Sequence, residues 1–85
     1  MNVNKKNIDG VKSAERVFQI MELFQIEKAQ LSAKNISEKL FMPRSSTNVL
    51  IKTMLKKGYL GYDQNDYTYF PTTKIAQLSE WALEH

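Results

Sequence analysis

The residues of this 85-residue chain best suited to do chemistry follow Pro43, and they are the types that read base edges in DNA. They recur at the spacing of one helix face: Arg44, Ser45, Asn48, Val49 and Lys52. Arginine pairs with guanine and asparagine with adenine, each through two hydrogen bonds, while an apolar side chain can contact the thymine methyl. We predict that this face binds DNA, with Ser45 on a base or phosphate and Lys52 on the backbone. The alternative is that Ser45 caps the helix and that Arg44, Asn48 and Lys52 are simply solvated surface residues.

The distribution of charge favours a polyanionic partner. The formal net charge is +3, but the segment from Lys39 to Tyr62 has five basic residues and no acidic one. From Asp63 onward there are one basic and four acidic residues. A continuous positive segment suits a nucleic acid. A solvated, lysine-rich helix face is the alternative interpretation.

Phosphate contacts are expected at the start of the helix that precedes this segment. Ser32 is placed to cap that helix, and its first backbone N–H groups, with the Lys34 side chain in the first turn, can meet phosphates. Lys56 and Lys57 are further candidates, although cations at a helix C-terminus also favour the helix dipole.

Other function classes find little support in the composition. The chain has no cysteine, and its one histidine is the last residue, His85, so thiol chemistry, histidine catalysis and the usual zinc sites are excluded. Neither a Gly-rich phosphate loop nor a carboxylate cluster is present. We therefore expect no enzyme, no metal and no cofactor. With no apolar run of the ~18 residues that span a membrane and no signal-peptide core, the expected location is the cytoplasm.

Length allows one small domain. Residues 1–12, rich in Asn and Lys, are expected to form a flexible N-terminal arm, which can also reach DNA, and residues 13–82 the folded domain. The last three residues, 83–85, read Leu-Glu-His, as in a common expression tag, and we expect a tag remnant. Native origin of these three residues is the alternative.

Capping residues and apolar spacing predict the order helix, helix, turn, helix, hairpin, helix. Ser13 is expected to cap the first helix and Ser32 the second. The third helix, about 43–57, follows the turn at Pro43 and ends at a glycine. Two aromatic runs around residues 63–66 predict a β-hairpin, whose tyrosines we expect to pack across the strands rather than stack on single-stranded nucleic acid. A last helix is expected to follow Thr72 or Thr73.

The first helix carries more apolar surface than one core needs. From Val17 to Ile26, seven of ten residues are apolar, whereas packing on one side needs a stripe of only ~100°. The excess predicts a second buried face, and we expect a homodimer through this helix. A helix wrapped deeply in its own core is the alternative.

Two stretches of sequence resemble the DNA-binding domain of IclR-type transcriptional regulators. The start of that domain resembles residues 13–24, which read S-A-E-R-V-F-Q-I-M-E-L-F. Its helix-turn-helix resembles residues 31–60, above all in P-R-S followed by L-I-K-T-M and G-Y-L. The resemblance implies a winged helix-turn-helix, mainly α with a small β-hairpin: a three-helix core, a two-stranded wing and a C-terminal helix. MarR-like proteins are near relatives in fold. It also implies a dimeric bacterial repressor or activator whose third helix enters the major groove.

The chain departs from the family pattern at three places. Phe41 stands where the family usually has glycine, Val49 where it often has a basic residue, and the wing tip bears Asp63 and Asp66 without a cation. Phosphates repel an acidic wing, so we expect no deep minor-groove insertion. A winged helix that binds a protein without reading DNA is the alternative function. Because the family's ligand-binding domain normally follows this region, no effector site is expected here.

Overall fold

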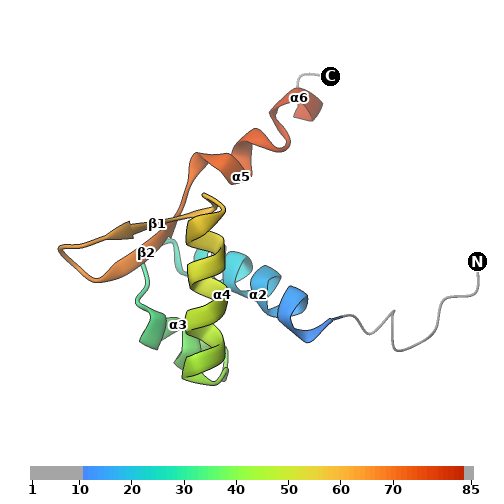
Figure 1. Ribbon diagram of the computed structural model, residues 1–85. Coiled ribbons are helices and arrows are strands. Elements are labelled where there is room, and N and C mark those ends of the chain that lie inside the picture. The colour runs from blue at the N-terminus through green and yellow to red at the C-terminus, as the bar shows by residue number, and fades with distance from the viewer. Residues whose placement is uncertain (1–10, 84–85) are drawn as a thin grey trace, which may run out of the picture.

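Residues 11–83 are described by the computed structural model (Figure 1). Their elements are, in order, α2 (Lys12–Glu27), α3 (Ala33–Lys39), α4 (Arg44–Lys56), β1 (Leu60–Asp63), β2 (Thr68–Pro71), α5 (Thr73–Gln77) and α6 (Glu80–Leu83). The mainly helical winged helix-turn-helix architecture is confirmed. Residues 1–10 of the expected arm and 84–85 of the expected tag remnant lie outside the described residues. Val11 is the N-cap residue of α2, Lys12 belongs to α2, and Leu83 belongs to α6.

The start of α2 differs from the prediction. Val11 is the N-cap residue, without a side-chain hydrogen bond, and its carbonyl accepts from the Glu15 N–H at 3.0 Å. Ser13 therefore lies inside the first turn, and its assignment as the cap was wrong. Because the Val11 carbonyl already starts the ladder of helical hydrogen bonds, a cap two residues later has no place.

The beginning of α3 is fixed by a reciprocal cap. The Asn35 N–H donates to Ser32 Oγ at 3.0 Å, and the Ser32 N–H donates to Asn35 Oδ1 at 3.3 Å. Two N–H groups that the helix leaves without partners are satisfied in this way. The predicted cap at Ser32 is confirmed.

The turn between α3 and α4 has one residue in the left-handed region. Phe41 has a φ of 53°, and its side chain is 94% exposed. The next residue, Met42, is buried and donates its N–H to the Ser37 carbonyl at 2.9 Å. Pro43 is the N-cap residue of α4, and its carbonyl accepts from the Thr47 N–H at 3.0 Å.

The core lies where α2, α3 and α4 meet the first strand. Thr47, fully buried on α4, donates its hydroxyl to the Pro43 carbonyl at 2.9 Å, so its polar group is satisfied. The buried apolar side chains come from these elements and from the segments that precede α3 and α4: Ile20, Leu23, Phe24, Leu31, Ile36, Met42, Ile51, Met54 and Leu60.

The wing is an antiparallel hairpin joined to the helical core. Its register runs from Leu60 opposite Pro71 to Asp63 opposite Thr68. In addition to its pairing with β1, the β2 residue Tyr69 forms a β-bridge with Leu31, with N···O distances of 3.0 and 2.7 Å. This bridge fixes β2 to the segment that leads into α3.

The C-terminal part is two short helices, not the single helix expected. The Thr72 hydroxyl caps α5, as predicted, by accepting from the Lys74 N–H at 3.3 Å. Neither α5 nor α6 buries a residue, and Trp81 is 69% exposed. Figure 1 shows both helices projecting away from the other elements. Short helices gain most of their stability from packing. Because neither α5 nor α6 has a buried face, packing does not favour one continuous helix over the two short ones.

Candidate nucleic-acid interface

The outer face of α4 carries the residues predicted to read DNA. Thr47, Ile51 and Met54 point into the core, which turns the opposite face of the helix to solvent. Arg44, Ser45, Val49 and Lys52 are exposed on that face, and Asn48 is half-buried at its edge. The structure therefore brings all five side chains to one side of one helix, which we call the α4 outer face.

The electrostatics of this face favour an anion. The segment 39–62 has no carboxylate in its sequence. Among the described residues, Lys39 is the cation held by an acid, with its Nζ 3.1 Å from Glu27 Oε1. Arg44, Lys52 and Lys56 have no such pairing within residues 11–83. A concentrated positive field along one helix attracts a polyanion.

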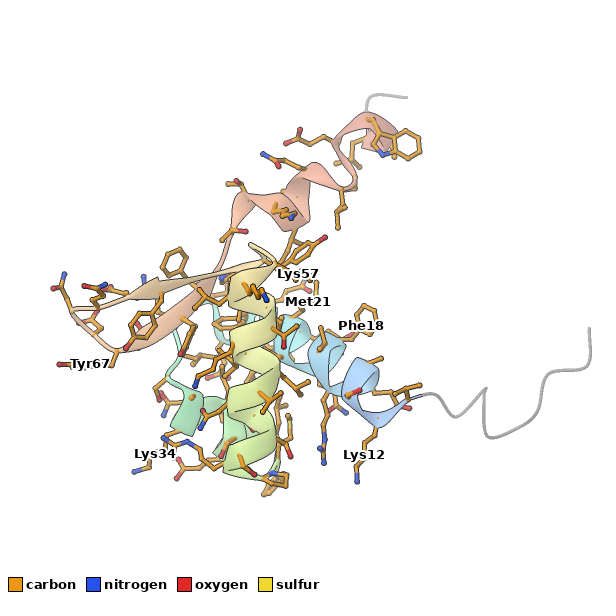
Figure 2. All side chains as sticks on the ribbon, viewed as in Figure 1. Lys12, Phe18, Met21, Lys34, Lys57 and Tyr67 are labelled. Carbon is orange, nitrogen blue, oxygen red and sulfur yellow. The ribbon has the colours of Figure 1, made fainter. Side chains whose placement is uncertain are left out.

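At the start of α3, one predicted phosphate contact has a second role. Both the N–H and the hydroxyl of Ser32 are used in the cap with Asn35. Lys34 is exposed, and Figure 2 shows it extending toward the end of the molecule at which α4 begins. Lys12, which was expected to belong to the N-terminal arm, points toward the same end (Figure 2). Lys34 and Lys12 thus both extend toward the end of the molecule at which α4 begins.

The other end of α4 is held by contacts that the sequence did not reveal. Lys74 Nζ donates to the Lys57 carbonyl at 2.7 Å and lies 4.8 Å from the centroid of the Tyr59 ring. The Thr72 hydroxyl donates to the Gly58 carbonyl at 2.6 Å. These groups satisfy carbonyls at the C-terminal end of α4, where a cation also suits the helix dipole. Sequence separations of 14 and 17 residues give no local signal of such contacts.

The wing tip keeps its acidic character. Asp63 Oδ1 accepts from the Asn65 N–H at 2.9 Å, which shapes the turn. Tyr67 is 72% exposed with a φ of 56°, and Figure 2 shows it at the wing tip, away from α4. Tyr62 and Tyr69 pack across the strands with ring centroids 4.8 Å apart, as predicted. Burial raises the pKa of the Tyr69 phenol above its usual 10.0, and the electrostatic effect of the nearby Tyr62 raises it further, as the smaller of the two causes.

A groove runs between α2 and the start of α5. It has a volume of about 580 Å³ and is lined by apolar side chains that include Phe18, Met21 and Ile75. Phe18 is 62% exposed, and Figure 2 shows Phe18 and Met21 pointing from α2 to the side on which α5 lies. The excess apolar surface expected on the first helix is therefore present, and no segment between residues 11 and 83 covers it.

Metal and membrane sites are not seen in the part of the chain that the structure describes. Between residues 11 and 83, no three metal-ligating side chains come together. No helix of the same range has the length and apolar character to cross a membrane.

The comparisons with known proteins agree with this geometry. Residues 13–64 match the family model of the IclR helix-turn-helix domain. The fold is similar to the crystal structure of an IclR family transcriptional regulator from Brucella abortus, with a TM-score of 0.80 and 20% identity. That match covers 100% of this chain but 31% of the other, so this chain spans about a third of its length. No curated protein matches.

Proposed function

Because the chain belongs to the IclR helix-turn-helix family, we propose that it binds double-stranded DNA sequence-specifically as part of a bacterial transcriptional regulator. The observation that carries the proposal is the α4 outer face. There, a basic helix without carboxylates exposes side chains of the types that recognise bases. A regulator of this kind works where the bacterial chromosome lies, so the proposed location is the cytoplasm.

In the proposed complex, the first half of α4 enters the major groove. Arg44 and Asn48 have the fork-shaped groups that recognise guanine and adenine, and Ser45 adds a hydroxyl at the helix start. Lys52 and Lys34 lie farther out and neutralise phosphates. Ser32 contributes by holding the first turn of α3 in place. The acidic wing tip stays outside the minor groove, because phosphates repel Asp63 and Asp66.

We further propose that the chain binds DNA as a homodimer through α2. The groove beside Phe18 and Met21 and the exposed Trp81 and Leu78 on the C-terminal helices leave apolar surface that a second copy can cover. A two-fold dimer presents two α4 helices to half-sites about one helical turn, ~34 Å, apart. The expected binding site is therefore a palindrome.

Salt-dependent binding to a fluorescent duplex tests the DNA proposal. If Lys34, Lys52 and Lys56 each neutralise one phosphate, the log–log slope of affinity against salt is about −2.7 per subunit. Lys52→Ala is expected to weaken binding and to reduce the slope by about 0.9, whereas Arg44→Ala should weaken binding through the lost guanine contact. Lys28→Asn is the matched control, since it removes one charge outside α4 and asparagine tolerates the left-handed φ of 51° at that position.

The second candidate function is a protein-binding winged helix. The acidic wing tip and the exposed Tyr67 favour it, because this surface suits a basic protein segment rather than DNA. Absence of duplex binding at low salt, with the protein folded, would reject the DNA proposal and favour this one.

A further inference from the structure

An exposed valine sits in the middle of the α4 outer face. Val49 is 64% exposed, one helical turn from Ser45 on one side and from Thr53 on the other. A β-branched residue at an exposed helix position gains no burial and favours the helix less than alanine or lysine does. Neither the core nor the stability of the helix therefore accounts for valine here. A lone exposed valine is ordinary on a surface, but this one lies among the side chains proposed to read bases.

The neighbouring threonine extends the apolar character of this stretch. The Thr53 hydroxyl donates to the Val49 carbonyl at 2.9 Å, so its hydrogen is used within the helix. Thr53 is exposed, and Val49 and Thr53 thus offer methyl groups without a free hydroxyl hydrogen. Arg44 precedes these two residues on the helix, and Lys52 lies between them in the sequence; both supply polar contacts.

The major groove has one apolar group on its base edges, the methyl at C5 of thymine. Adenine, guanine and cytosine present hydrogen-bonding groups there, and an apolar side chain against them removes water without replacing its hydrogen bonds. We propose that Val49 is a specificity-determining residue that reads a pyrimidine 5-methyl group at the base pair facing the middle of α4. Thymine and 5-methylcytosine both carry this group. The inference rests on the proposed DNA-binding function.

The test begins with a duplex selected from a random library by the full chain. Each thymine of the selected site is then replaced in turn by deoxyuridine, which removes the methyl and keeps the base pairing. At one position in each half-site, the loss is expected to weaken binding about fourfold, the factor for burying one methyl group. Val49→Ala should abolish this difference between thymine and uracil. Arg44→Ala, the matched control, should weaken binding to both duplexes and keep their ratio.

A second pair of duplexes distinguishes the sources of the methyl group. Cytosine and 5-methylcytosine are compared at the sensitive position, opposite guanine. Tighter binding of the methylated base supports recognition of the methyl group from either source, and equal binding supports thymine as its one source. Equal affinity for thymine and uracil at every position overturns the inference while leaving DNA binding intact. Failure to bind any duplex overturns the inference together with the proposed function.

Discussion

The backbone at Phe41 makes a stability prediction that can be worked from the structure. Phe41 has a φ of 53°, which costs a residue with a Cβ about 1–2 kcal/mol relative to glycine. Its side chain is 94% exposed, so removing it gives up almost no buried apolar area. Glycine loses about 0.5–1 kcal/mol more conformational entropy on folding. Phe41→Gly should therefore raise the free energy of unfolding by about 0.5–1 kcal/mol.

Thermal unfolding followed by circular dichroism measures this change. For a domain of this size, the expected gain corresponds to a rise in Tm of about 2–8 °C. Phe41→Ala is the matched control, because it removes the same ring but keeps the Cβ that the left-handed backbone disfavours. Its Tm should stay near that of the unmodified chain. All proteins are compared at one concentration, since a dimer makes Tm concentration-dependent. If Phe41→Gly unfolds at or below the temperature of Phe41→Ala, the strain argument is wrong.

Four other outcomes follow from the contacts described. Ser32→Ala should lower the free energy of unfolding in urea by about 1 kcal/mol, because the α3 cap is lost; no change would contradict the cap. Lys74→Met should lower the free energy of unfolding by about 0.5–1.5 kcal/mol, because the hydrogen bond to the Lys57 carbonyl and the contact with the Tyr59 ring are both lost; an unchanged urea midpoint would argue against this link. Phe18→Ser should shift the sedimentation coefficient from dimer to monomer, whereas a dimer that persists would place the interface elsewhere. Tyr69, whose folded pKa lies above its unfolded 10.0, stabilises the fold below pH 10 and loses this contribution as pH rises through the folded pKa; in an absorbance titration at alkaline pH, Tyr69→Phe should remove a phenol that ionises above pH 10.

Local signals in the sequence predicted much of the helix-turn-helix. Ser32 and Pro43 act on groups within four residues, so their effects depend on little else. The alternation of core and solvent faces on α4 follows from helical spacing, and it placed Arg44 and Val49 correctly on the exposed side.

Where several local solutions compete or distant contacts decide, the sequence was not enough. Ser13 looked like a cap, but the N-cap residue is Val11, so α2 begins two residues closer to the N-terminus than predicted. The bridge between Leu31 and Tyr69 and the contact of Lys74 with Lys57 join segments far apart in the chain. The break between α5 and α6 reflects the lack of a packing surface within residues 11–83, which spacing alone does not reveal.

Amide chemical-shift mapping on a ¹⁵N-labelled chain with a short duplex tests the central claim most directly. If α4 enters the major groove, the largest shifts fall on residues 44–52 and at the start of α3. The wing tip, residues 63–67, should change little because its carboxylates stay away from phosphates. Large shifts at the wing tip or along the groove beside α2, with α4 unchanged, would contradict DNA recognition by α4.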